Sequence, residues 1–114
     1  MRLRSTVAAA VAAAALVLTL PTSAEAAQGQ FSYVFHDWSG GSHVGVLDNP
    51  QSRECITLPE TGNGYAPPAD SPRNSTDATA VVFTGVDCTG DSFSLRPFGE
   101  RASERLKLRS VVFS

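Results

Sequence analysis

The 114-residue chain has few reactive side chains: two Cys, two His, one Trp and a single Lys. Neither Cys belongs to a C-x-x-C pair, and neither His accompanies a recognisable Ser or Cys nucleophile motif. Charged residues make up only 18% of the chain and the net charge is −2, which argues against a dedicated nucleic-acid-binding protein. We therefore expect a single domain that is not an enzyme and holds no metal or cofactor.

The only long apolar run lies near the N-terminus. Arg2 and Arg4 precede apolar residues 7–20, and Ala24-Glu25-Ala26 supplies a small-x-small cleavage pattern, as in a secretory signal peptide. The run is shorter than the roughly 20 residues that span a bilayer, so we expect no membrane span. Cleavage after Ala26 removes two Arg and one Glu, which takes the net charge from −2 to −3. The prediction is a secreted, extracellular domain of residues 27–114, and the preference for Arg and Ala suggests a bacterial source.

Cys55 and Cys88 both lie in this secreted part. An even number of cysteines in a small extracellular chain predicts a disulfide bond, here joining the two halves of the domain. Closing a loop of this length stabilises a fold by roughly 3.5–4 kcal/mol in the chain-entropy account. We favour this structural bond over a metal site or a reactive thiol.

Beyond the signal peptide, short β-rich runs alternate with turn residues, which predicts an all-β sandwich or barrel. The expected strands are 31–35, 43–47, 54–58, 79–84, 92–96 and 106–113. Residues 59–74 contain four Pro and two Gly, so we expect a long irregular connection there. The expected core residues are Tyr33, Phe35, Val44, Val46, Ile56, Leu58, Val81, Phe83, Phe93, Leu95, Leu106, Leu108 and Val112.

The chain also repeats a pattern at an offset of 50 residues. Tyr33–Ser42 and Phe83–Ser92 both contain an aromatic residue, then Asp, Ser or Thr, Gly and Ser at equivalent positions. An aromatic strand residue followed by a Gly-closed turn and a second strand is typical of a β-hairpin. The repeat therefore predicts two hairpin units whose sheets pack against each other.

These residues resemble the folded-hairpin signature of βγ-crystallin Greek keys. Tyr33, Trp38 and Gly40 match it, whereas the second copy has Cys88 in place of the second aromatic residue. The final run through Ser110 is similar to the last strand of a crystallin key, with Ser71 as a weaker counterpart. The secreted layout also looks like small actinobacterial crystallin-like proteins, a group with peptidase-inhibitor-like and killer-toxin-like members. The resemblance implies a single two-Greek-key sandwich.

Microbial members of this family often bind calcium, and the residues argue against such a site here. Counted back from Ser110, the acidic pair of the calcium signature falls on Arg105 and Leu106, which cannot ligate the ion. The string Asp48–Arg53 is more simply a turn. His36 and His43 are expected to face each other across a hairpin. With Asp37 they would supply only three of the four protein ligands that a closed zinc site usually has, so we favour exposed histidines without a metal.

Four residues are candidates for binding a partner: Trp38, Arg105, Lys107 and Arg109. The three cations alternate with apolar residues, which places them on one face of the expected final strand. They would form either a docking stripe for an anionic partner or, as we favour, a charged edge that prevents aggregation. Trp38 lies at a hairpin tip, where the resemblance favours a packing role over an exposed anchor.

Three function classes compete. The first is a monomeric, non-enzymatic binding or structural protein with an unidentified extracellular ligand. The second is a peptidase inhibitor that presents the Pro-rich loop 59–72 to a protease, since proline lowers the entropy cost of presenting a loop. The third is an antimicrobial or toxin-like protein that docks on anionic surfaces such as cell-wall polymers. Protease titration and salt-sensitive binding to cells would separate them.

Overall fold

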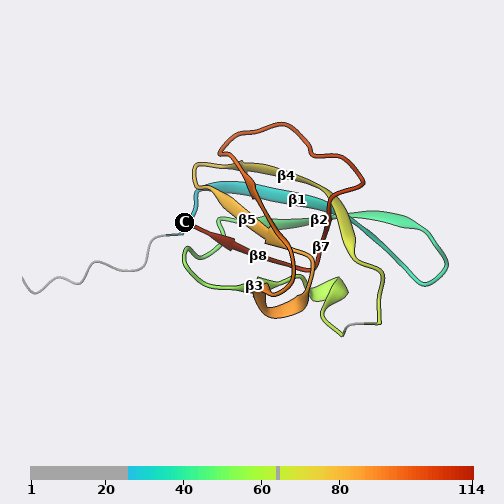
Figure 1. Ribbon diagram of the computed structural model, residues 1–114. Helices are drawn as coiled ribbons and strands as arrows, with labels where there is room; N and C mark the ends of the chain where they lie inside the picture. The colour runs from blue at the N-terminus through green and yellow to red at the C-terminus, as the bar shows by residue number, and fades with distance from the viewer. Residues whose placement is uncertain (1–25, 64) are drawn as a thin grey trace, which may run out of the picture.

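A computed structural model describes residues 26–63 and 65–114 (Figure 1). The predicted signal peptide, residues 1–26, lies outside the described residues except for Ala26. The described chain is all-β, and none of it forms a helix long and apolar enough to cross a membrane. Its elements are β1 (Gly29–His36), β2 (Ser42–Asp48), β3 (Ile56–Thr57), the 3-10 turn η2 (Pro59–Thr61), β4 (Ala69–Thr76), β5 (Ala80–Phe83), the 3-10 turn η3 (Val86–Cys88), β6 (Ser92–Leu95), β7 (Lys107–Leu108) and β8 (Ser110–Phe113).

The strands form two antiparallel four-stranded sheets, ordered β2-β1-β4-β7 and β3-β8-β5-β6. Each half of the chain therefore contributes three strands to one sheet and one strand to the other. The third strand of the first half, β3, pairs with β8, while the third strand of the second half, β7, pairs with β4. Because of this exchange, neither half can complete its own sheet alone.

The core lies between the sheets. Along β1, Phe31 and Tyr33 point inward at the two-residue period of a strand, and Phe31 meets Phe113 of β8 edge to face at 5.4 Å. Burying two aromatic rings removes a large apolar area from water and is a major source of stability. The buried apolar core residues are Ala27, Phe31, Tyr33, Leu58, Ala69, Ala80, Val82, Leu108, Val111 and Phe113.

The predicted core was correct at Tyr33, Leu58 and Leu108, which are fully buried. It was wrong at Val44, Val46 and Phe93, which are exposed. The remaining predicted residues are only partly buried, namely Phe35, Ile56, Val81, Phe83, Leu95, Leu106 and Val112. In β5 and β8 the inward face carries Val82 and Val111 instead, because a one-residue change of phase moves every side chain to the opposite face.

The expected irregular connection 59–74 contains a strand that the sequence analysis missed. β4 is eight residues long and lies between β1 and β7. Pro72 is tolerated inside it because the register with β1 shifts there, and Ser71 takes a left-handed φ of 51°. The side chain of Asn74 is buried, but its amide donates hydrogen bonds to the carbonyl oxygens of Ala78, Leu95 and Arg96. A polar strand can therefore occupy a buried position.

The predicted final strand 106–113 is two strands. β7 ends at Leu108 in the first sheet, and β8 begins at Ser110 in the second. Arg109 lies between them, where the chain crosses from one sheet to the other. The three cations therefore do not line one face of a single strand.

The disulfide between Cys55 and Cys88 is present, with Cα atoms 6.0 Å apart. It joins the residue before β3 to η3, in the turn that follows β5. The bond thus fastens β3, the strand that the first half contributes to the second sheet. It links the two halves of the domain, as predicted.

Candidate functional site

The tip of the β1–β2 hairpin, residues 37–41, is organised around one carboxylate. Asp37 accepts hydrogen bonds from His43 Nε2 (2.8 Å), from the hydroxyl and amide of Ser39 (2.7 and 3.0 Å), and from the amide of Gly41 (2.7 Å). These bonds, led by that from His43, hold the pKa of Asp37 well below its usual value. Gly40 supplies the left-handed φ of 89° that closes the turn. The tip is therefore ordered by its own side chains.

Trp38 projects from this tip with 75% of its surface exposed. The packing role favoured by the crystallin resemblance is wrong. Where the resemblance expects a hairpin folded back on the sheet, the first hairpin continues the β1–β2 ladder outward, as its tip in Figure 1 shows. An indole held in water on an ordered turn is a costly arrangement unless a partner covers it.

A second exposed aromatic residue lies between η2 and β4. Tyr65 is 83% exposed; it belongs to the predicted inhibitory loop 59–72, but no sequence pattern singled it out. Its backbone is braced: the Asn63 side-chain oxygen accepts from the amides of Tyr65 and Ala66, and Arg109 Nη2 donates to the Ala66 carbonyl at 3.1 Å. Arg109 also lies near the Thr84 carbonyl (3.4 Å). This predicted binding residue is therefore half-buried and engaged with the backbone.

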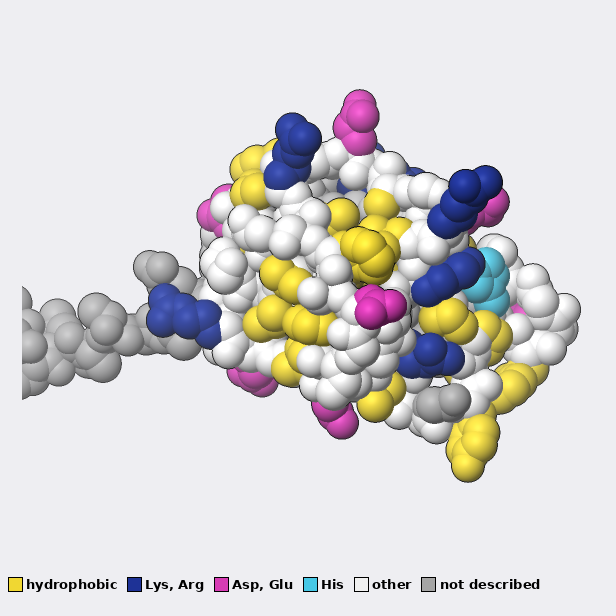
Figure 2. Space-filling model, in the orientation of Figure 1, with side chains coloured by type: hydrophobic (Ala, Val, Ile, Leu, Met, Phe, Trp, Pro, Cys, Tyr) yellow, Lys and Arg dark blue, Asp and Glu magenta, His cyan; other side chains and the backbone are white. Residues whose placement is uncertain are grey.

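The two aromatic residues lie at the same end of the first sheet. Val34 of β1 pairs with Asp70 of β4, so the end of β1 and the start of β4 lie side by side. The hairpin tip follows the end of β1, and residues 65–68 lead into the start of β4. We call this end, with Trp38 and Tyr65, the aromatic end. Figure 2 shows hydrophobic, cationic and histidine side chains gathered on that side of the molecule.

A polar cluster lies directly beneath the hairpin tip. His36 Nε2 lies 2.6 Å from Oδ2 of the buried Asp70, whose other oxygen accepts from the Ser71 hydroxyl at 2.7 Å. Lys107 Nζ is 3.6 Å from the same carboxylate. Burial raises the pKa of Asp70, but the bonds from His36 and Ser71 and the charge of Lys107 outweigh it, so the pKa is lowered. The cluster ties β1, β4 and β7 together.

The expectation that His36 and His43 face each other is wrong. His36 pairs with Ser42 across the hairpin, and His43 pairs with Phe35, whose ring stacks on it at 5.3 Å. Each histidine instead has its own carboxylate, Asp70 or Asp37. Within residues 26–63 and 65–114, no three His, Cys, Asp or Glu side chains gather in a way that could hold a metal ion.

Four exposed cations lie on β4 or near its border with β7. Lys107 is directly opposite Asp70, and Arg101 Nη1 donates to the Ser71 carbonyl at 2.8 Å. Arg105 is exposed two residues before Lys107, and Arg73 is exposed on β4 itself. The structure therefore brings Lys107 and Arg105 of the predicted set to a common border and adds two cations from elsewhere in the chain.

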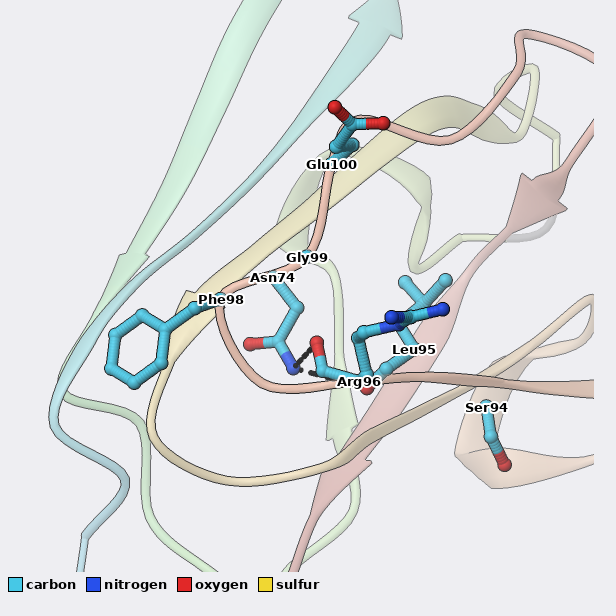
Figure 3. Close-up of a pocket in the computed structure, with 7 residues that line it drawn as sticks. All are labelled: Asn74, Ser94, Leu95, Arg96, Phe98, Gly99 and Glu100. Atoms are coloured by element: carbon cyan, nitrogen blue, oxygen red, sulfur yellow. Dashed lines mark hydrogen bonds between the residues drawn. The ribbon is translucent and has the colours of Figure 1, made fainter.

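Two cavities lie away from the aromatic end. The larger, of about 410 Å³, is drawn in Figure 3 and lined by Asn74, Ser94, Leu95, Arg96, Phe98, Gly99 and Glu100. The Asn74 amide and the backbone amides of Phe98 and Gly99 are already used in hydrogen bonds within the fold. The Phe98 ring points away from Asn74 (Figure 3). The smaller cavity, of about 220 Å³, is lined by Ala26, Ala27, Ser52, Arg53, Asp77, Ala78 and Ser114.

The aromatic end and its cationic border are thus the best candidate for a functional surface. They combine exposed aromatic side chains with Lys and Arg, the composition that carries binding energy in many interfaces. Comparison of the chain with known proteins finds no matching family model, no matching curated protein and no matching solved structure.

Proposed function

We propose that this chain is a secreted, non-enzymatic binding protein that attaches through the aromatic end to an anionic extracellular polymer, such as a phosphate-bearing cell-wall polymer. The observation that carries the proposal is the exposure of Trp38 and Tyr65 at one end of a sheet whose border presents Lys107, Arg105 and Arg73. Aromatic faces give contact area, while the cations attract the polymer and orient it.

The proposed architecture is a two-Greek-key, βγ-crystallin-like sandwich. The strand order supports it, since in each half the first, second and fourth strands share a sheet and the third crosses to the other. Ser110 also supports it: its hydroxyl accepts from the Cys88 amide (2.8 Å) and donates to the Gly85 carbonyl (2.6 Å), which anchors the second turn to β8. Ser71 makes no such bond to the first hairpin and donates to Asp70.

Because Trp38 is the only Trp, its fluorescence reports directly on the aromatic end. We expect titration with a phosphate-bearing wall polymer to shift Trp38 emission and to weaken as salt is added, since the charge contribution is screened. Loss of either aromatic side chain, in Trp38→Ala or Tyr65→Ala, should weaken binding about tenfold, measured by cosedimentation with cell walls.

The matched control is Phe98→Ala, which removes another strongly exposed aromatic side chain, from the border of the larger cavity. This variant should bind like the unaltered protein. The proposal fails if Trp38 emission does not respond at millimolar polymer repeats, or if all three alanine variants bind equally well.

A second candidate function, peptidase inhibition, is favoured by one observation. Tyr65 is strongly exposed on a braced segment that Pro67 and Pro68 close, a suitable shape for entering a protease cleft. The predicted inhibitory loop 59–72 is shorter than expected, because residues 69–72 belong to β4. Residual protease activity in the presence of excess protein tests this function, and inhibition that Tyr65→Ala leaves unchanged excludes this segment.

A further inference from the structure

The outer border of β2 is an unusually open sheet edge. β2 is seven residues long, and in the described part of the chain it pairs only with β1. The other edge strands are shorter: two residues for β3 and β7, and four for β6. A long edge presents a row of unpaired backbone groups, and proteins usually protect it with Pro, Lys or a bulge. The sequence Ser42–Asp48 has neither Pro nor Lys.

The hydrogen-bond pattern shows which backbone groups point outward. Asp37 N donates to Gly41 O at one end of the ladder, and Asn49 N donates to Gly29 O at the other. Hydrogen-bonded pairs alternate along an antiparallel ladder, so the odd-numbered residues of β2 bond to β1. The backbone groups of Ser42, Val44, Val46 and Asp48 therefore face away from the sheet.

The outer face of this edge is apolar at its centre. Val44 is 63% exposed and Val46 is 46% exposed, and Val34 of β1 lies directly beside Val44. Gly45, between the two valines, has no side chain, and a Cβ there would clash with the Tyr33 ring on the inner face. The centre of the strand therefore carries no side chain at Gly45 and has an exposed valine on each side.

We propose that β2 pairs with β2 of a second copy of this chain, antiparallel and centred on Gly45. In this register Val44 lies opposite Val46 of the second copy, and Ser42 lies opposite Asp48. All of these residues have outward-facing backbone groups, so the full length of the edge can form hydrogen-bonded pairs. Gly45 meets its own copy in a non-hydrogen-bonded pair, where the backbones approach most closely.

This pairing is self-complementary, as a two-fold interface requires. It covers four exposed valines with one another and places no two like charges opposite, since Asp48 is the only charged residue in the strand. The result is one continuous sheet made from two four-stranded sheets. It also places the hairpin tips at opposite ends, about 34 Å apart along the strand direction for Gly40 and its copy. A dimer would thus carry two outward-facing tips.

Sedimentation equilibrium of the purified, oxidised protein tests the dimer over a range of concentrations. We expect the mass to double as concentration rises, and Val46→Lys to weaken dimer formation about tenfold, because it places two cations near each other at the interface. The side chain of Val46 points to solvent in the single chain, so circular dichroism should remain unchanged. The control Ser94→Lys adds the same charge to the edge strand β6 and should dimerise normally.

The double variant Val44→Glu/Val46→Lys tests the register itself. Each new Glu then faces a Lys of the second copy, so dimerisation should recover relative to Val46→Lys alone. A protein that stays monomeric up to about millimolar concentration overturns the proposal. So does a dimer that Val46→Lys leaves unchanged, or one that the double variant weakens further.

Discussion

At the scale of single residues, the strands beneath the hairpin tip are joined by a carboxylate that the sequence did not mark. Asp70 lies in the segment 59–74, which was expected to be irregular. Its carboxylate is nevertheless buried, hydrogen-bonded to His36 and Ser71, and paired with Lys107. Isolated Asp residues in Pro-rich stretches are usually turn formers, so sequence reasoning had no basis for a buried role. Its neighbours come from three strands and are brought together only by folding.

Asp70→Asn should lower stability by about 1–3 kcal/mol at neutral pH, because it removes a buried carboxylate that accepts bonds from charged and polar partners. The pKa of Asp70 is lower in the folded chain than its ordinary 3.8. As the pH falls below 3.8, the unfolded chain takes up a proton first, so the contribution of Asp70 is complete above this value and disappears below it. Urea unfolding at neutral and strongly acidic pH measures this. An equal deficit at both pH values would contradict the assignment.

At the scale of elements, the prediction from sequence succeeded where side chains alternate and failed where they do not. The β1–β2 hairpin was found because aromatic residues recur at every second position of Phe31–Phe35 and Gly closes the turn. The runs Val81–Phe83 and Val111–Phe113 are continuously apolar, so no period shows which side chain faces the core. β4 was missed because its polar residues are satisfied by partners far away in the chain. The same limitation hid Tyr65 and the cavities.

The second turn depends on a single buried hydroxyl. Ser110 bridges the Cys88 amide and the Gly85 carbonyl, so Ser110→Ala leaves two backbone groups without their partner. We expect a loss of about 1–3 kcal/mol, visible as a lower urea midpoint with an unchanged slope. Ser94→Ala, which alters an exposed hydroxyl on β6, is the control and should unfold like the unaltered protein. Equal stability of the two variants would show that the bridge contributes little.

At the scale of the whole molecule, charge is unevenly placed. The expected secreted domain carries a net charge of −3, yet Arg73, Arg101, Arg105 and Lys107 share one border. Long-range electrostatic attraction depends on such local fields more than on the net charge of the protein, so an acidic protein can still bind an anionic polymer. Attachment should consequently be strongest at low salt, and washing with about 1 M salt should release most of the protein from cell walls.

The position of the disulfide changes what a protease can do to this protein. Cys55 precedes the exposed segment around Tyr65 and Cys88 follows it, so a single cut after Tyr65 leaves both fragments in one covalent molecule. The pairings of β1 with β4 and of β3 with β8 would also hold the two cut pieces together. Limited digestion that cuts after Tyr65 alone should therefore give a single band without reductant and two bands with it. Cleavage at Tyr65, the most exposed large hydrophobic side chain of the described residues, would thus leave the domain nicked but assembled.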